Sequence, residues 1–404
     1  MKKIFLVLSI LHLTFSILPA SQNPWLQKTS LPAQGRHGAC TFSIGDRVYF
    51  GTGHNNGGNV DVLFDDWWEY DPGTDSWSQK ANFGGGLRKW ANAFSIGNKG
   101  YLGTGEDPST AEDYDLWEYD PVQNTWTQKA DLIGGAREGA NSFTVANKAY
   151  MCAGSFWADV WEYDPANDTW TQMADFPDWG GRICSVSFSI NGKGYMGLGC
   201  DGNNFQPNAD WYEFDPSSNT WTQKANLPGP PRSGPAAFAV TGKGYIACGT
   251  SWPNVLDVFT DCYEYDPTND TWKRIQDFPG QGRRFTVAAS VNNRGYTCTG
   301  TNGINLNDLW EFNPSLVEGI NTNEEKTSCS IFPNPMRDHA TLQISSVKND
   351  LRFILYDASG KKIREQKCHS SSLIIDRDEL QAGIYFCSLS EGTKNLYSGK
   401  LIIE

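Results

Sequence analysis

The stretch WEYDPANDTW, from Trp161 to Trp170, decides the fold because the chain repeats it. Related stretches, WEYDPGTDSW, WEYDPVQNTW, WYEFDPSSNTW, YEYDPTNDTW and a shortened WEFNPS, begin at Trp68, Trp117, Trp211, Tyr263 and Trp310. The Asp or Asn before the proline stands at positions 71, 120, 164, 215, 266 and 313, so the period is 44 to 51 residues. A period of this length is typical of propellers and other repeat architectures.

Each repeat predicts four antiparallel strands. Upstream of the motif, two short alternating strands are joined by a tight turn such as Asn191-Gly192, which is a strong hairpin signal. The motif supplies the third strand, and its Asp-Pro makes a turn because proline fixes φ and the short polar side chain caps the bend. The second Trp begins the fourth strand. Four strands in about 50 residues are the size of a propeller blade.

The sixth copy lacks its last strand, and the N-terminus supplies a match. Residues 23–28, NPWLQK, resemble residues 219–224, NTWTQK, which form the fourth strand of an earlier repeat. Pairing the two ends of the chain in one blade closes the ring and leaves no unpaired sheet edge. We therefore predict an all-β fold with a six-bladed β-propeller over residues 21–315, closed by an N-terminal strand.

These features resemble the kelch-repeat family of β-propellers over roughly 290 residues. The resemblance lies in the paired aromatics, in the Gly-rich ends of the second strands, such as Gly51-Thr52-Gly53, and in an Arg that opens each repeat. The chain departs from many kelch repeats because it has Gly-x-Gly or a weaker pattern instead of a Gly-Gly doublet. This departure concerns the subfamily and not the fold.

The termini indicate export. Lys2 and Lys3 precede an apolar run from Ile4 to Leu18 that ends in Pro19-Ala20, which predicts a secretory signal peptide over residues 1–20. A membrane anchor is the alternative, but the run is short for a spanning helix and contains His12 and Thr14. We predict no transmembrane segment in the mature chain.

Residues 327–404 follow a polar linker, residues 316–326, and predict a small C-terminal β-sandwich. This arrangement resembles the type A C-terminal sorting domain of the type IX secretion system of Bacteroidetes. The matching elements are Pro333-Asn334-Pro335, Tyr356-Asp357, Leu380–Tyr385 and Lys400–Ile402. The resemblance implies that the secretion machinery is a partner, that the chain is secreted or displayed on the cell surface, and that the tail is usually removed.

Composition excludes some functions. The formal net charge is −13, and an acidic surface repels nucleic acid, so we predict no nucleic-acid partner. The ten cysteines form no CxxC pair, so zinc is not indicated. The pairs Cys184/Cys200 and Cys248/Cys262 could form disulfides, but small residues in tight strands are the favoured interpretation.

Loop lengths indicate which face carries the site. The turns within each hairpin are tight, whereas the connections between the second and third strands, such as His54–Asp66, are long and share one face with the links between blades. Function concentrates on loops held by a rigid scaffold. This face also carries tryptophans outside the repeat, namely Trp90, Trp157, Trp179 and Trp252.

Acidic and amide residues accompany these tryptophans, namely Asp61, Glu106, Asp107, Asp113, Asp201, Asn203, Asn204 and Asn254. Aromatic rings beside carboxylates and amides suit sugars, because rings stack on C–H faces while the polar groups bond hydroxyls. The alternative is packing between neighbouring loops.

The arginines that open the blades form a second candidate set, namely Arg36, Arg88, Arg137, Arg182, Arg232 and Arg283 (or Arg284). Because the first strand is innermost, they could ring the channel mouth and bind an anion. The alternative is a structural ion pair with the glutamates of the repeated motif, Glu69, Glu118, Glu162, Glu213, Glu264 and Glu311. Sixfold occurrence favours this structural role, because a catalytic group needs one special environment.

His37 and His54 are further candidate ligands on the long-loop face. Galactose oxidase, a copper enzyme, also has a kelch propeller, but its pattern includes an adjacent Tyr-His pair, and this sequence has none. The motifs GxSxG, HExxH and the P-loop are also missing. We therefore predict no metal and no cofactor.

Two functions remain. The first is a binding module for a glycan or a protein, and an enzyme is less expected because catalytic motifs are missing. The alternative is a sugar-acid enzyme, since six-bladed kelch propellers include N-acetylneuraminate mutarotase and the arginines could hold a carboxylate. That resemblance concerns fold and blade number, which do not determine function.

Overall fold

The structure is a computed structural model that describes residues 23–59, 61–178, 180–202, 205–251, 257–317, 329–344, 351–357, 360–368, 370–391 and 394–404. The chain divides into two compact units, residues 1–320 and 321–404. The boundary lies within the predicted linker, residues 316–326. The predicted signal peptide lies outside the described residues.

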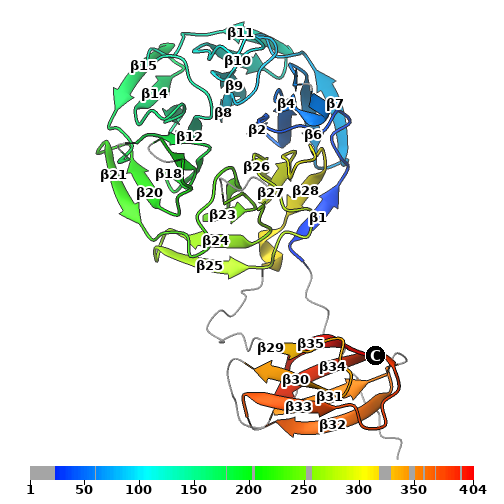
Figure 1. Cartoon of the computed structure of the whole chain (residues 1–404). Coiled ribbons are helices and arrows are strands. Elements are labelled where there is room, and N and C mark those ends of the chain that lie inside the picture. Colours follow the sequence, from blue (N-terminus) through cyan, green and yellow to red (C-terminus); the bar gives the residue numbers. More distant parts are fainter. Residues whose placement is uncertain are drawn as a thin grey trace, which may run out of the picture. The chain divides into compact units, whose positions relative to one another are not determined.

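Six four-stranded antiparallel sheets form the larger unit, and they radiate around a common axis like the blades of a propeller (Figure 1). From the innermost strand outward, blade one is β2 (Cys40–Ile44), β3 (Arg47–Gly51), β6 (Trp67–Asp71) and β7 (Ser76–Lys80), and blade two is β8 (Asn92–Ile96), β9 (Lys99–Gly103), β10 (Leu116–Asp120) and β11 (Thr125–Gln128). Blade three is β12 (Asn141–Val145), β13 (Lys148–Cys152), β14 (Val160–Asp164) and β15 (Thr169–Met173), and blade four is β17 (Val186–Ile190), β18 (Lys193–Gly197), β20 (Trp211–Asp215) and β21 (Thr220–Lys224). Blade five is β22 (Ala236–Val240), β23 (Lys243–Ala247), β24 (Cys262–Asp266) and β25 (Thr271–Ile275), and blade six is β26 (Val287–Val291), β27 (Arg294–Cys298), β28 (Leu309–Phe312) and β1 (Trp25–Lys28).

Short elements lie outside these sheets. They are the two-stranded ribbons β4 (His54–Asn55) with β5 (Val62–Leu63) and β16 (Arg182–Ile183) with β19 (Cys200–Asp201), and the 3-10 turns η1 (Gly57–Asn59) and η2 (Pro314–Leu316). Both ribbons include residues that begin or end the long connections. They extend the blades at the face where the sequence predicted a site.

The ring is closed as the sequence predicted. Each inner strand contacts the inner strands of both neighbouring blades, and β2 of blade one meets β26 of blade six. The N-terminal strand β1 pairs with β28, with Trp25 opposite Phe312. Trp25 is buried and packs edge-on against Phe278 at 5.2 Å. The two ends of the propeller sequence therefore share one sheet and one core.

The repeated motif clamps each blade to the one before it. In blade three, Trp170 Nε1 donates to the carbonyl oxygen of Ala130, at the end of blade two, at 2.9 Å. Asp168 Oδ1 accepts the backbone N–H of the same Ala130 at 2.9 Å and the hydroxyl of Tyr163 at 2.8 Å. The Trp–carbonyl bond recurs in Trp77–Thr29, Trp126–Ala81, Trp221–Ala174 and Trp272–Ala225. The turn therefore joins neighbouring blades as well as two strands.

Replacing Asp168 by Ala should lower the free energy of unfolding by about 1–3 kcal/mol, because it leaves the Ala130 N–H and the Tyr163 hydroxyl without their acceptor. Urea denaturation of the purified chain would measure the loss. Asn167→Ala is the matched control, because Asn167 bonds only within the exposed turn, to Asp164 at 3.2 Å. Equal losses in the two variants would contradict the clamp.

Small residues let the blades approach closely. A Cβ added at Gly100 would lie 2.1 Å from the ring of Phe42 in the preceding blade. The same contact joins Gly194 to Phe143 and Gly244 to Phe188. A side chain at these positions would push the Phe ring out of the interface between blades. The repeated glycine after the lysine of the second strand is thus a packing requirement.

The smaller unit is a β-sandwich. One sheet has the order β29–β30–β33 and the other β32–β31–β34–β35, with strands β29 (Cys329–Phe332), β30 (His339–Ile344), β31 (Leu351–Tyr356), β32 (Lys362–Cys368), β33 (Ser372–Asp376), β34 (Gly383–Glu391) and β35 (Lys394–Ile403). Its core is apolar and includes Leu342, Phe353, Leu389 and Leu401, all fully buried. This unit has a hydrophobic core of its own, as expected of an independent domain.

The candidate disulfide residues are thiols in this structure. Cys184, Cys200, Cys248 and Cys262 carry no disulfide, in agreement with the interpretation as small residues in tight strands.

Within the described ranges, no helix has the length and apolar character needed to span a membrane.

Candidate functional site

The six blade-opening arginines are buried and paired, so they do not form the predicted anion-binding ring. Arg137 donates through Nη1 to the carbonyl oxygen of Ala153 at 3.0 Å, and through both terminal nitrogens to Asp159 at 2.6 and 2.9 Å. The equivalent pairs are Arg36–Asp66, Arg88–Asp115, Arg182–Asp210, Arg232–Asp261 and Arg283–Asp308. Bidentate pairing occupies both terminal nitrogens of these guanidinium groups, which hold the second strand of each blade against the third.

The expected partners of these arginines were the glutamates of the motif, and that expectation is wrong. The acid is instead the aspartate five residues before the Asp or Asn that precedes the proline of the motif. The glutamates accept the hydroxyl of a tyrosine on the adjacent second strand, as Glu162 does from Tyr150 at 2.6 Å. The same bond is made by Tyr49–Glu69, Tyr101–Glu118, Tyr195–Glu213, Tyr245–Glu264 and Tyr296–Glu311.

The residues that directly follow the six buried arginines belong to another ring, in which residues are paired through their backbones. Each of these residues is bonded through its backbone to a residue just beyond the second strand, as in the reciprocal bonds of Lys89 with Glu106 at 3.0 and 2.8 Å. We call the twelve residues the mouth ring. They are His37/His54, Lys89/Glu106, Glu138/Ser155, Ile183/Cys200, Ser233/Thr250 and Arg284/Thr301. The backbone repeats sixfold here, but the side chains do not.

One residue further along, six residues form a second ring that we call the collar. They are Gly38, Trp90, Gly139, Cys184, Gly234 and Phe285, and all have φ between 52° and 61°. Backbone hydrogen bonds run from one collar residue to the next, from Trp90 N–H to Gly38 O at 3.0 Å through to Phe285 N–H to Gly234 O at 2.7 Å. The collar therefore marks the end of the central channel.

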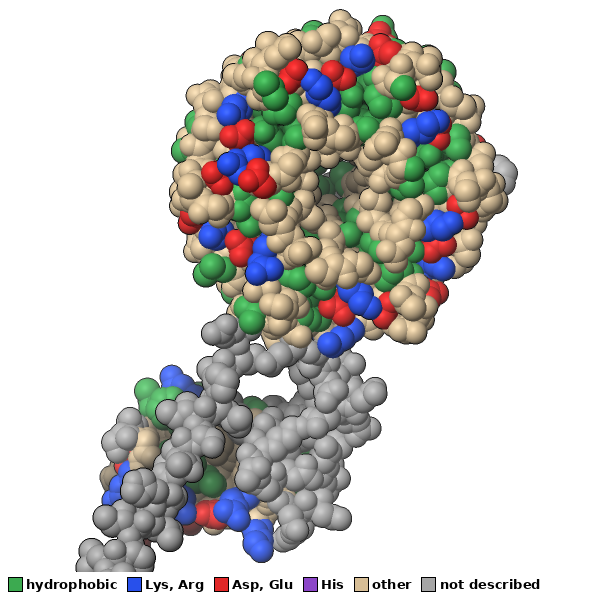
Figure 2. Space-filling view, turned by 180° about the vertical axis from the view of Figure 1, so that it is seen from behind, with side chains coloured by type: hydrophobic (Ala, Val, Ile, Leu, Met, Phe, Trp, Pro, Cys, Tyr) green, Lys and Arg blue, Asp and Glu red, His purple; other side chains and the backbone are tan. Residues whose placement is uncertain are grey.

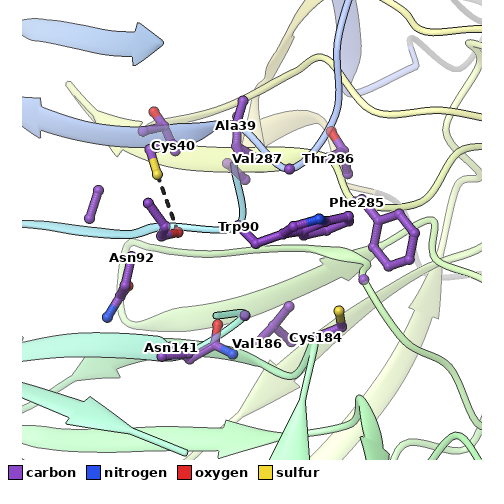
Figure 3. Close-up of a pocket in the computed structure, with 18 of the residues that line it drawn as sticks. Ala39, Cys40, Trp90, Asn92, Asn141, Cys184, Val186, Phe285, Thr286 and Val287 are labelled. Carbon is purple, nitrogen blue, oxygen red and sulfur yellow. Dashed lines mark hydrogen bonds between the residues drawn. The ribbon is translucent and has the colours of Figure 1, made fainter. Parts of the chain in front are cut away.

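The channel itself is lined by small and neutral side chains. A cavity of about 200 Å³ lies at the collar, and Figure 3 shows Trp90, Phe285 and Cys184 around it together with Asn92 and Asn141. A second cavity of about 250 Å³ continues between the inner strands and is lined by Ser, Thr, Ala and Phe. The face of the propeller in Figure 2 has a central hollow, and its basic and acidic side chains lie over the blades, away from that hollow. The residues that line the two cavities are uncharged, whereas the mouth ring contains Lys89, Glu106, Glu138 and Arg284.

The two candidate histidines meet in the mouth ring. The ring centroids of His37 and His54 are 4.1 Å apart, and both residues are buried. Nδ1 of His54 lies 2.6 Å from Asp61 Oδ1, and Nδ1 of His37 lies 2.6 Å from Asn305 Oδ1. These contacts place the proton of each neutral ring on Nδ1 and leave Nε2 as an acceptor. Burial and the neighbouring His54 lower the pKa of His37 to about 4.

A charged chain leads from His54 to the other side of the mouth ring. Asp61 also lies 3.0 Å from Lys89 Nζ, and Lys89 lies 2.9 Å from Glu106. Glu106 in turn acts on Glu138 in the next blade. Burial, followed by the charge of Glu106, raises the pKa of Glu138 to about 7. A carboxyl with this pKa can both donate and accept a proton near neutral pH.

This pKa predicts a pH effect on stability. Because the pKa of Glu138 rises from 4.5 to about 7 on folding, ionising the group opposes folding. Stability should be highest below pH 4.5 for this group and fall as the pH rises towards 7. Replacing Glu138 by Gln should remove that decline, which urea denaturation at several pH values would show. A constant difference in stability between the two proteins at every pH would contradict the raised pKa of Glu138.

Arg284 is the unpaired cation of the mouth ring. Among the described residues, its Nε and Nη1 atoms are buried and have no hydrogen-bond partner. Its guanidinium lies 5.0 Å from the ring centroid of Phe285, and its charge acts on both His37 and Cys184. The charge of Glu138 also acts on Cys184. An unpaired guanidinium is suited to a carboxylate ligand.

The remaining candidates are not brought into this cluster. Trp157 is 53% exposed on the loop between β13 and β14. Trp179 and Trp252 lie outside the described residues, as do Asn203, Asn204 and Asn254. Trp90 is the candidate tryptophan that lies in the collar, where its ring centroid is 5.5 Å from that of His37. The described residues contain no group of three or more His, Cys, Asp or Glu that could hold a metal ion.

Sequence reasoning missed part of the site. Asp61, Glu106, His37 and His54 were named as candidates, but Lys89 and Glu138 were not, and Arg284 was considered only as a substitute for Arg283. A signal was present, because the residue after the repeated arginine changes from blade to blade. Because the surrounding repeat is constant while this residue type varies, the fold does not require a particular side chain at this position.

The fold and its second domain define the class of protein as an exported β-propeller. Residues 330–404 match the family described as secretion system C-terminal sorting domain. The chain therefore carries a type IX sorting domain and is exported to the cell surface or secreted. The solved structure of YjhT shares the propeller fold, with a TM-score of 0.61 and 18% identity over 73% of this chain and 99% of that chain.

Several curated relatives match part of the chain. N-acetylneuraminate epimerase of Haemophilus influenzae (strain 86-028NP) is 28% identical over 49% of this chain and 53% of its own length. N-acetylneuraminate epimerase 1 of Escherichia coli O6:H1 is 29% identical over 37% and 39%. Endo-acting ulvan lyase of Formosa agariphila is 26% identical over 35% and 26%. The chain thus spans about half or less of the length of these relatives.

Proposed function

We propose that the propeller binds a sugar acid at the mouth ring and interconverts its anomers. The observation that carries this proposal is the unpaired guanidinium of Arg284, whose Nε and Nη1 atoms are buried, in the same ring of residues as Glu138, a carboxyl whose pKa is raised to about 7. An unpaired buried cation costs free energy unless an anion joins it. The sugar-acid alternative thus gains support over a module that only binds.

The residues would divide the work as follows. Arg284 holds the carboxylate of the sugar, and Glu138 in its protonated form donates to the ring oxygen. Nε2 of His54, which lacks a partner among the described residues, accepts the proton of the anomeric hydroxyl. The bond between the anomeric carbon and the ring oxygen then breaks to give the open-chain carbonyl, and closure on the other face reverses the proton transfers. Asp61 positions the His54 ring through Nδ1.

The relatives support the same chemical class. N-acetylneuraminate is a carboxylated sugar, and epimerases of this sugar match about half of this chain or less. The ulvan lyase among the matches also acts on a carbohydrate, as its name states. The two observations favour a sugar ligand over a protein ligand at this face.

The test is an NMR assay of anomer exchange. The full chain is added to freshly dissolved α- or β-N-acetylneuraminate and to hexuronates, and the approach to the anomeric equilibrium is followed. We expect a rate above that of buffer for at least one sugar acid and none for the corresponding neutral sugar. A rate equal to buffer for every sugar acid removes the catalytic proposal.

Binding without turnover is the second candidate, and exposed aromatic rings favour it. Trp157 and Phe205 are 53% and 51% exposed, and Phe205 packs edge-on against Phe156 at 5.1 Å. Such rings stack on sugars. A glycan array probed with the full chain and with its Trp157→Ala variant would test this role. We expect the unaltered chain to bind a glycan that the variant does not bind.

We also propose the finer features that the sequence predicted. The blades belong to the kelch type, which is supported by the paired aromatics and the sixfold arginine. Residues 1–20 are a signal peptide that is removed during export. N-terminal sequencing of the secreted protein should give Ser21 or a neighbouring residue as the first residue.

A further inference from the structure

Two bulky aromatic residues occupy positions that the fold makes unfavourable for them. All six collar residues have positive φ, a region in which side chains with a Cβ are strained. Blades one, three and five place Gly38, Gly139 and Gly234 there, whereas blades two and six place Trp90 and Phe285. Strained residues persist where they have a function.

The two rings extend over the glycines of their neighbours. A Cβ added at Gly38 would lie 3.0 Å from the indole of Trp90, and one at Gly234 would lie 2.4 Å from the ring of Phe285. Trp90 and Phe285 also contact each other, with ring centroids 4.7 Å apart and planes at 88°. Figure 3 shows the two rings beside each other at the pocket. The glycines thus provide the space that the rings fill.

These rings lie between two compartments. Below, both line the channel cavity of about 200 Å³. Above, they contact the mouth ring, because Trp90 lies against His37 and His54 at 5.5 and 5.6 Å and Phe285 lies under the guanidinium of Arg284. A ligand held by Arg284 therefore meets the aromatic pair before it meets the channel.

We propose that Trp90 and Phe285 form the floor of the ligand site and limit the length of the sugar acid that it accepts. This inference rests on the proposed function. The floor supplies an apolar surface for the C–H face of a sugar ring, while Arg284 holds its carboxylate. It also separates the ligand from the channel, which is lined by small neutral side chains and would otherwise be continuous with the site.

The experiment removes the floor with the residue that other blades already use. Trp90→Gly and Phe285→Gly restore at blades two and six the glycine of Gly38, Gly139 and Gly234, so both variants keep a compatible backbone. Isothermal titration of the full chain with N-acetylneuraminate and with a disaccharide of the same sugar gives the ratio of the two affinities. Cys184→Gly is the matched control, because it makes the same change at a collar position with a small side chain.

We expect each glycine variant to bind the monosaccharide roughly fivefold to tenfold more weakly, the loss of one aromatic contact. The disaccharide should bind no more weakly than before, so the preference for the monosaccharide falls. Trp90→Phe should restore most of that preference, which a merely structural role would not require. The Cys184→Gly control should keep it.

The outcomes are distinct. If the unaltered protein binds N-acetylneuraminate and the ratio is the same in all folded variants, the floor is refuted and the proposed function stands. If the unaltered protein binds no sugar acid at all, the proposed function is refuted, and the inference falls with it. Thermal unfolding of each variant shows that a lost preference does not arise from a lost fold.

Discussion

Replacing Arg284 by methionine should reduce the affinity for a sugar acid and the rate of anomer exchange by roughly 100-fold or more. A buried guanidinium that pairs with a ligand carboxylate contributes about 2–5 kcal/mol when one partner is truncated. Methionine keeps most of the aliphatic volume but removes the charge. Titration calorimetry and the NMR assay measure the two losses.

The matched control is Arg294→Met in the same blade. Arg294 lies on the β26–β27 hairpin at the other end of the blade and pairs with Glu311 at 3.5 Å. It should leave both quantities unchanged, and Arg284→Lys should retain part of the affinity because lysine keeps the charge without the planar fork. A folded Arg284→Met protein with full affinity would show that the ligand carboxylate is held elsewhere.

Replacing Arg137 by methionine should lower the free energy of unfolding by about 3–5 kcal/mol, because it leaves the largely buried Asp159 carboxylate without its partner. Arg137 is fully buried and also holds the Ala153 carbonyl at 3.0 Å. The effect should appear in urea denaturation as a lower midpoint. It should recur at the five equivalent arginines, since the same contacts recur there.

A double variant separates charge from packing. Adding Asp159→Asn to Arg137→Met removes the unpaired charge. The amide oxygen of the new Asn can still accept the hydrogen bond that Trp161 Nε1 donates to Asp159 Oδ2. We expect the double variant to be more stable than Arg137→Met alone. An additive loss would instead assign the effect to the lost contacts with the backbone.

The architecture could be predicted from the sequence because its determinants are local and repeated. The Asp-Pro turn and the second Trp set the strand boundaries in every blade, and six copies of one pattern count the sheets. Trp25 identified the closing strand because it matches the same position. What the pattern did not reveal was the clamp, since the partner of Trp170 is a backbone carbonyl of the preceding blade.

The site was harder to predict for a physical reason. Repetition pointed to the arginines, but residues that repeat in every blade stabilise the scaffold. Their guanidinium groups form ion pairs with Asp66, Asp159 and the equivalent residues. Those aspartates also repeat, five residues before the Asp or Asn that precedes each motif proline, and could have been recognised. The mouth ring could not be assembled from the sequence, because blades two, three and six bring Lys89, Glu138 and Arg284 together only when the ring closes.

The mouth ring also suggests how such a protein can change. Each blade contributes two residues to the ring, one just beyond its second strand and one immediately after a buried arginine that is itself fixed by its aspartate. A duplicated blade would therefore inherit the complete scaffold and, after its arginine, a position that the scaffold leaves free to vary. Substitutions at His37, Lys89, Glu138, Ile183, Ser233 and Arg284 would alter recognition without disturbing the blades, so the ring is a compact target for evolution and for engineering new ligand preferences.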